Sequence, residues 1–297
     1  MVAPLCTSTT ERLPVVAGSL QETGATVMSH ADQGFGTAGR EYFRFISQMT
    51  PENDGPVWMV NFMHYKAEAA YPDGSHGLTG READDLYTPV DVLDRIGASV
   101  PFYGDVVMQL DPNPPRWDRV GVVKYPTRAS FLQMQTRPDF LERLVHKHAG
   151  MESTIITGCQ PMPIPDGMMP DPTTWSALEH APNDEDGPVM VIHMMKFVTD
   201  GLPEGMAKYQ EKAGQLVRKY GGGPVAMFSV EGTIMGDGRE WDQVRFVAYP
   251  SLRAFFAMVG DPERRQAQSS HRNDSLEYTY TVVVRADIDN FTTAGAV

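Results

Sequence analysis

The chain contains one sequence pattern twice. Residues 117–138 read WDRVGVVKYPTRASFLQMQTRP and residues 241–262 read WDQVRFVAYPSLRAFFAMVGDP, so nine of the 22 positions are identical without a gap. A second match lies upstream, between PENDGPVWMVNFM at 51–63 and PNDEDGPVMVIHMM near 182–195. Because a long repeat marks a duplicated structural unit, the 297 residues predict two copies of one domain.

Both copies show the same order of predicted elements, which is strand, helix, two strands, helix and strand. In the first copy these elements are predicted at 56–65, 81–98, 100–111, 116–126, 127–149 and 153–159. In the second copy they are predicted at 188–197, 204–223, 224–236, 240–250, 251–275 and 278–285. A further helix is predicted at 40–49, with a shorter counterpart at 173–180.

This order is the β-α-β-β-α-β arrangement of ferredoxin-like domains, an α+β fold with an antiparallel sheet and both helices on one face. The other face of each sheet is apolar and has to be covered. We therefore expect the two repeats to pair face to face as an intramolecular α+β barrel. The expected organisation is an extended or poorly ordered arm at 1–36, repeats at 37–160 and 188–290, a proline-rich linker at 161–187 and a tail at 291–297.

Composition excludes several classes of partner. The net charge of −13, without a basic stripe that carries aromatic residues, argues against nucleic acid. No apolar run approaches the roughly 20 residues of a membrane span, and the N-terminus does not resemble a secretory signal. Cys6 and Cys159 lie far apart, which favours a reducing, cytoplasmic location and no cysteine-ligated metal. We predict no metal site.

Three features together resemble a bacterial family of unknown function in the dimeric α+β barrel superfamily. They are the strand that runs from Pro-Val through an Asn to Lys-Phe, the Trp-Asp to Tyr-Pro segment, and a His-Arg pair on the last helix. The second copy has Lys196 and Phe197 in this pattern but His193 at the Asn position. The first copy keeps Asn61 and has His64 in place of the lysine. The two copies cover most of the chain.

The resemblance implies a barrel whose relatives include cofactor-free monooxygenases, polyketide cyclases, muconolactone isomerases, haem-degrading enzymes and chlorite dismutases. Our leading hypothesis is a cofactor-independent lyase, isomerase or cyclase that acts on a small, largely apolar oxygenated metabolite. A cofactor-free or haem-linked monooxygenase and a non-catalytic binding protein are the alternatives. We expect no cofactor, with haem as the exception that the resemblance allows. The expected assembly is a monomer with a pseudo-dimeric barrel, or a homodimer.

Candidate catalytic residues lie on the strands. Alternate strand residues share a face, which puts Asn61 or His193 among apolar neighbours, either as satisfied core groups or directed into a cavity. His64 and Lys196 occupy equivalent positions near a strand end, where they are either solvated or held in a dry pocket as acid or base. Tyr103 has no counterpart in the second copy. The candidate catalytic residues are therefore His64, His193, Asn61, Lys196 and Tyr103.

Substrate-binding residues are predicted on the same strands, on the second helices and on an insertion. The insertion at 71–85 is absent from the second copy and is either a lid or a tolerated loop. The 18 methionines either fill the core flexibly or line a pocket for an apolar ligand. The predicted substrate-binding residues are Trp58, Met63, Met195, Arg245, His148, His271 and His76.

Overall fold

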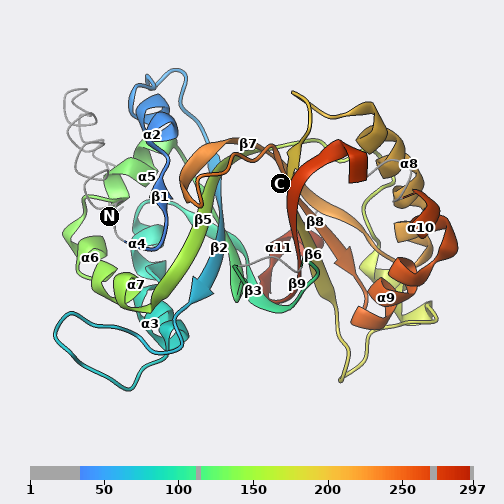
Figure 1. The fold of residues 1–297 in the computed structure, drawn as a ribbon, viewed down its shortest axis with the longest axis horizontal. Coiled ribbons are helices and arrows are strands. Elements are labelled where there is room, and N and C mark those ends of the chain that lie inside the picture. Colours follow the sequence, from blue (N-terminus) through green and yellow to red (C-terminus); the bar gives the residue numbers. More distant parts are fainter. Residues whose placement is uncertain (1–33, 112–114, 268–272, 295–297) are drawn as a thin grey trace, which may run out of the picture.

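The computed structural model describes residues 34–111, 115–267 and 273–294. Its centre is an antiparallel barrel (Figure 1). The first half of the chain contributes the strands β2 (Val57–Tyr65), β3 (Ser99–Gln109), β4 (Arg119–Tyr125) and β5 (Met151–Pro161). The second half contributes β6 (Val189–Phe197), β7 (Gly223–Gly236), β8 (Gln243–Tyr249) and β9 (Leu276–Asp289). A short strand, β1 (Thr37–Ala38), pairs with the end of β7.

Strand pairing closes the barrel. The order is β7-β5-β2-β4-β3-β9-β6-β8, and β8 pairs back to β7. Within each half the first strand lies between the third and the fourth, and the second strand lies beyond the third. The halves meet where β3 pairs with β9 and where β5 pairs with β7. The chain is therefore an α+β protein with a closed eight-stranded barrel, as the order of predicted elements indicates.

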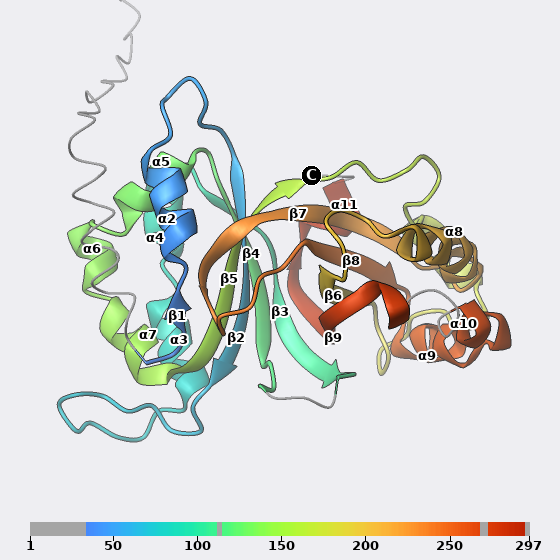
Figure 2. The same ribbon diagram turned by 45° about the horizontal axis from the view of Figure 1, so that its top comes forward.

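Helices cover the outside of the barrel in two groups (Figure 2). The first group consists of α2 (Arg40–Ser47), α3 (Gly80–Tyr87), α4 (Val90–Arg95), α5 (Arg128–Met134), α6 (Pro138–Leu141) and α7 (Leu144–Gly150). The second consists of α8 (Glu204–Lys219), α9 (Leu252–Gly260) and α10 (Pro262–Ala267). Shorter elements are the 3-10 helices η1 (Pro172–Ala177) and η3 (Asn273–Ser275) and the helix α11 (Asn290–Ala294).

Four predicted helices differ from the structure. The helix predicted at 251–275 is divided into α9 and α10, because Pro262 begins α10. The helix predicted at 81–98 is two helices, because Pro89 interrupts it and caps α4. The helix predicted at 127–149 is three, since Pro138 begins α6 in its middle. The counterpart predicted at 173–180 is the 3-10 helix η1, whose Trp175 is buried against the barrel core and donates to the Gly221 carbonyl at 2.7 Å. The linker predicted at 161–187 therefore contributes to the core.

Side chains alternate between the barrel interior and the helices. Inward residues from all eight strands form one buried core, which includes Trp58, Phe102, Phe228 and Phe246. Phe291 of α11 stacks on Phe102 with a centroid distance of 5.9 Å and joins this core. The outward residues form separate clusters with the helices of each half. The barrel interior is thus filled by side chains, and both halves share a single core.

The repeated Trp-Asp pair stabilises a bulge in each half. β2 shifts register after His64, and β6 shifts register after Lys196. At each bulge an aspartate accepts a backbone N–H, from Tyr65 to Asp118 Oδ2 and from Phe197 to Asp242 Oδ2, both at 2.7 Å. These carboxylates satisfy a donor that the bulge removes from the strand ladder.

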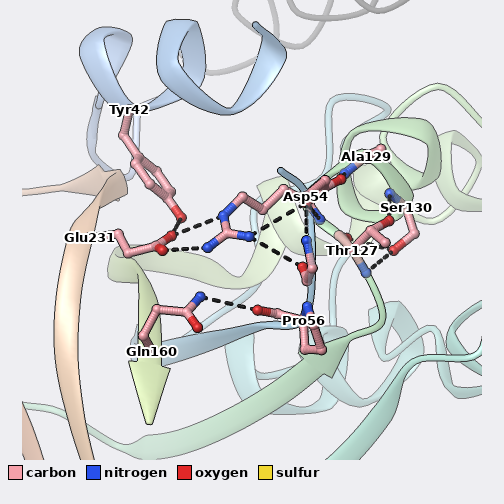
Figure 3. Close-up of polar contacts among 10 residues, drawn as sticks. Tyr42, Asp54, Pro56, Thr127, Ala129, Ser130, Gln160 and Glu231 are labelled. Atoms are coloured by element: carbon pink, nitrogen blue, oxygen red, sulfur yellow. Dashed lines mark hydrogen bonds and ion pairs between the residues drawn. The ribbon is translucent and has the colours of Figure 1, made fainter. Parts of the chain in front are cut away.

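The repeated Asp-Gly-Pro segment caps a helix in each half. Asp54 accepts the N–H groups of Arg128 and Ala129 at the start of α5, as Figure 3 shows. Asp186 accepts those of Leu252 and Arg253 at the start of α9. Each carboxylate accepts hydrogen bonds from N–H groups that have no partner within the helix, and its negative charge interacts favourably with the positive end of the helix dipole. The two repeated segments, Trp-Asp and Asp-Gly-Pro, therefore have the same structural roles in both halves.

A buried ionic network joins the two halves beside these caps (Figure 3). Arg128 of α5 donates through Nε and Nη2 to the Glu231 carboxylate of β7, with Nε at 3.0 Å from Oε2. The Tyr42 hydroxyl of α2 donates to the same Oε2 at 2.8 Å. The Tyr42 ring covers Gly158 and Gly232, where a Cβ would lie within 2.5 Å of the ring or its hydroxyl. These glycines pair across β5 and β7, so the ring packs directly on the junction between the halves.

Candidate functional site

A cavity of about 200 Å³ lies between the outer face of the barrel and the helices of the first half, with Ile234, Met235 and Ile288 of the second half also on its wall. Most of its wall is apolar. The residues that form this part include Phe43, Met59, Leu93, Tyr125, Phe131 and Phe140. A few polar residues also line this space, and they include Asn61, Asp84, Tyr103, Lys147 and His148. An apolar enclosure with a small set of polar groups is typical of sites for small organic ligands.

The cavity floor is a row of residues across three strands. Asn61 of β2 pairs with Gly121 of β4, and Gly121 pairs with Tyr103 of β3. A Cβ on Gly121 would lie 2.9 Å from the Tyr103 ring and 3.6 Å from the Met63 Cε. Glycine therefore leaves room here for the tyrosine ring to lie over the strand.

The equivalent row in the second half has a different composition. His193 of β6 pairs with Arg245 of β8, and Arg245 pairs with Met227 of β7. His193 Nδ1 lies 3.3 Å from the Thr281 hydroxyl, and Arg245 Nη2 donates to Gln243 Oε1 at 2.6 Å. A long side chain therefore occupies the central position that Gly121 leaves open in the first half.

Asp84 is the buried carboxylate of the cavity. It lies on α3, is 3% exposed, and receives the Tyr65 hydroxyl on Oδ2 at 2.6 Å. The Tyr103 hydroxyl lies 3.4 Å from the same oxygen, and Arg119 Nη1 lies 3.8 Å from it. Oδ1 accepts no hydrogen bond within the described part of the chain. Burial raises the pKa of Asp84, while Tyr65, Lys147 and Arg119 oppose that effect.

Arg119 organises the polar edge of the cavity. Its side chain is 2% exposed, and it donates from Nη1 to the Tyr103 hydroxyl at 2.7 Å. The same guanidinium pairs with Asp85 at 2.8 Å and with Asp105 at 2.9 Å. Burial, with the Asp84 charge second, raises the pKa of Tyr103 to about 12. Tyr103 is therefore a neutral hydrogen-bond donor near neutral pH, with its oxygen polarised by Arg119.

Lys147 and His148 enter the cavity from α7. Lys147 Nζ lies 5.0 Å from the Tyr87 ring centroid and 5.9 Å from that of Phe35. Burial lowers the pKa of Lys147, and Asp84 partly offsets this effect. The His148 ring packs edge-on against Phe35 at 5.3 Å. The cavity thus contains a carboxyl group and an amine whose pKa values are displaced toward each other.

Four of the predicted site residues line this cavity, and the other predicted residues that the structure describes lie elsewhere. Asn61, Met63, Tyr103 and His148 are the four that come together. His76 is exposed on the loop before α3, and His271 lies outside the described residues.

The predicted residues of the bulges and of the second half serve visible packing or pairing roles. His64 Nδ1 lies 2.8 Å from Asp118 Oδ2, and Lys196 Nζ lies 3.0 Å from Asp242 Oδ1. Trp58 is buried in the barrel core, and Met195 packs with Phe197 and Met206. His193 and Arg245 lie together on the second-half row described above. The aspartates of the repeated Trp-Asp pair therefore hold His64 and Lys196 in equivalent positions.

Sequence reasoning missed Asp84, Arg119 and Lys147. Asp84 falls inside the insertion at 71–85, which is the segment without a counterpart in the second half. Arg119 aligns with Gln243, so it is a charged strand residue that the other copy lacks. That asymmetry was a usable signal for both. Lys147 had no such signal, because its position in the cavity depends on how α7 packs.

The cavity does not fit a haem, the cofactor that the resemblance allows. Pockets for drug-sized ligands typically measure about 300–1,000 Å³, and a haem is larger than most such ligands. The cavity measures about 200 Å³. His148 is the histidine that lines the cavity, and histidine is a common ligand of haem iron. Its ring packs against Phe35. Among the described residues, no group of three or more His, Cys, Asp or Glu is placed to hold a metal ion.

The fold and this cavity define an α+β barrel protein with a small apolar site on one side. No protein-family profile matches the chain, and no curated protein matches it. Among solved structures, the RPA0582 protein of unknown function from Rhodopseudomonas palustris is similar, with 30% identity over 46% of this chain and 98% of that chain and a TM-score of 0.38.

Two further solved structures are similar over more of the chain. A mutant chlorite dismutase from Candidatus Nitrospira defluvii shows 13% identity over 77% of this chain and 90% of that chain, with a TM-score of 0.43. A candidate monooxygenase from Fusobacterium nucleatum subsp. nucleatum shows 10% identity over 78% of this chain and 92% of that chain, with a TM-score of 0.41.

No helix in the described part of the chain is long and apolar enough to cross a membrane.

Proposed function

We propose that the first-half cavity catalyses proton transfer on a small, largely apolar carbonyl compound, as in a lyase, isomerase or cyclase step. The observation that carries this proposal is Asp84, a buried carboxyl group that faces an apolar cavity and has a raised pKa. Enzymes raise the pKa of a carboxyl group in this way when it acts as an acid or base near neutral pH.

The neighbouring groups supply the rest of such a reaction. Asp84 would accept a proton from the carbon next to the substrate carbonyl. The Tyr103 hydroxyl, polarised by Arg119 at 2.7 Å, would donate a hydrogen bond to the oxygen on which negative charge develops. The Tyr65 hydroxyl holds Asp84 Oδ2 at 2.6 Å and so fixes the orientation of the carboxylate. His148 and Asn61 remain candidates for contacts with the substrate.

Deuterium exchange tests this proposal without knowledge of the substrate. The protein would be incubated in D₂O with acetophenone, cyclohexanone and 4-oxopentanoate, and NMR would follow exchange of the protons beside each carbonyl. We expect catalysed exchange of at least one probe, and a loss of about 100-fold or more in Asp84→Asn, which removes a general base while keeping the side-chain shape. Because burial raises the pKa of Asp84, the rate should rise with pH through a midpoint above the ordinary carboxyl range.

Lys219→Met is the matched control, because Lys219 lies on the far half and pairs with Asp261 at 2.9 Å. It should leave exchange unchanged. The proposal is wrong if the wild-type protein exchanges none of the probes, or if Asp84→Asn exchanges them at the wild-type rate.

We also propose that the two halves are tandem ferredoxin-like repeats that arose by duplication. The repeated caps at Asp54 and Asp186 and the repeated bulge contacts at Asp118 and Asp242 support this origin. The cavity then reflects divergence after duplication, since Gly121 and Asp84 belong to the first copy alone.

A further inference from the structure

Lys147 is an amine whose charge the cavity offsets only in part, through Asp84. Its Nζ forms no hydrogen bond or ion pair with the residues the structure describes, and it lies over the rings of Tyr87 and Phe35. Two other lysines have carboxylate partners, with Lys196 at 3.0 Å from Asp242 and Lys219 at 2.9 Å from Asp261. A charged amine in apolar surroundings is unfavourable unless an anion pairs with it.

The described charged residues around the cavity form no ion pair with Lys147, and the Asp84 charge offsets the effect of burial only in part. Asp84 is the carboxylate that shares the cavity with Lys147, and its Oδ2 is held by Tyr65 and faces Arg119 at 3.8 Å. Asp85 and Asp105 contact the Arg119 guanidinium at 2.8 and 2.9 Å. The carboxylates on this side therefore gather around Arg119, and Lys147 faces the apolar part of the space.

The remaining wall is suited to a compact apolar body. Met59, Phe131 and Phe140 lie on the cavity wall with Leu93 and Tyr125. An apolar cavity of about 150 Å³ is large enough to bind benzene. A cavity of about 200 Å³ therefore has room for a ring or short chain with one small polar group.

We propose that this cavity binds a small apolar monocarboxylate, with its carboxylate facing the Lys147 ammonium and its apolar body against Met59, Phe131 and Phe140. The inference deepens the proposed function by naming the substrate class of the same site. It also assigns Lys147 a role in substrate binding that is separate from the proton transfer at Asp84. A bound carboxylate favours the charged form of the amine, which burial disfavours.

Calorimetric titration of the whole protein with matched ligand pairs tests the inference. The probes are benzoate against benzamide and hexanoate against hexanamide, which share shape and differ in charge. We expect at least one acid to bind the wild-type protein tenfold or more tightly than its amide. In Lys147→Met, which keeps the length and apolar stem of the side chain, that preference should fall below twofold.

Two controls separate this inference from the proposed function. Lys219→Met should keep the acid preference. Asp84→Asn should keep it too, because removal of a negative charge from the cavity does not weaken the binding of an anionic ligand. An acid preference in a wild-type protein that exchanges none of the deuterium probes would overturn the proposed chemistry alone. Equal binding of acid and amide by the wild-type protein, no binding of any probe, or a preference that survives in Lys147→Met would overturn this inference. The wild-type comparison decides the matter even if Lys147→Met does not fold.

Discussion

At the scale of single residues, the difference between the two halves comes down to a few substitutions on equivalent strands. Gly121 stands where the second half has Arg245, and Tyr103 stands where it has Met227. The glycine admits the tyrosine ring, and Arg119 then orients the tyrosine hydroxyl at 2.7 Å. A smaller residue in the middle of a strand thus determines where a polar group can enter an apolar cavity.

We expect Gly121→Ala to destabilise the protein by about 1–3 kcal/mol, the usual cost of overpacking. The new Cβ would lie 2.9 Å from the Tyr103 ring, and the hydrogen bond from Arg119 limits how far that ring can move. Denaturant unfolding would measure the change. Gly260→Ala is the control, because nothing lies within 4 Å of its added Cβ, and it should change stability by less than about 0.5 kcal/mol. Equal effects of the two variants would show that the cavity floor is not tightly packed.

At the scale of elements, the halves are connected by side chains as well as by strand pairing. Arg128 at the start of α5 reaches Glu231 on β7, and Tyr42 of α2 shares that carboxylate. The side chain of Arg128 is 6% exposed and that of Glu231 is 18% exposed, so the pair is largely shielded from water. Without Glu231, the buried Arg128 would keep only Asp54, 3.4 Å away, as a carboxylate partner, and a poorly paired buried charge costs far more than loss of a surface pair.

Glu231→Leu should therefore lower the free energy of unfolding by about 3 kcal/mol. Arg95→Met is the surface comparison, since the Arg95 side chain is 53% exposed and pairs with Asp91 and Asp139, and it should cost about 1 kcal/mol or less. Adding Arg128→Met to Glu231→Leu should recover part of the loss, because the buried cation that has lost its nearer carboxylate is then removed. A cost below 1 kcal/mol for Glu231→Leu in denaturant titration would contradict a stabilising role for the network.

At the scale of the whole molecule, the two halves are one folding unit. Their inward side chains form a single core, in which Phe228 of the second half lies 6.3 Å from Trp58 of the first. Strand pairs β3–β9 and β5–β7 close the barrel across the same boundary. Neither half could bury its inner face without the other.

Phe228→Ala should destabilise both halves equally, by about 3–5 kcal/mol, because Phe228 is fully buried in the shared core. Hydrogen exchange measured by mass spectrometry would report this as equal losses of protection in peptides from β2 and from β6. Val145→Ala, at a 40% exposed position on α7, is the control and should leave both peptides protected. Loss of protection in β6 alone would mean that the halves unfold independently.

The sequence by itself determined the order of strands and the closed barrel, because both depend on local patterns that occur twice. Strand alternation, the capping aspartates and the Trp-Asp bulges act over short distances, and each is visible in the printed residues. Four of the residues proposed from the sequence, Asn61, Met63, Tyr103 and His148, lie together in the cavity. Pro89 and Pro138 are residues that commonly interrupt helices, but the helix breaks at these positions were not predicted.

Only the tertiary structure decided which half holds the cavity and which charges enter it. Asp84 and Lys147 come from α3 and α7, which are far apart in sequence and meet where the first-half helices pack together. Their displaced pKa values arise from burial, which depends on every element that covers them. His64 and Lys196, which occupy equivalent sequence positions, lie outside the cavity, and each pairs with the aspartate at the bulge of its own half. The repeat thus determined the barrel, and long-range packing decided where charged groups were enclosed.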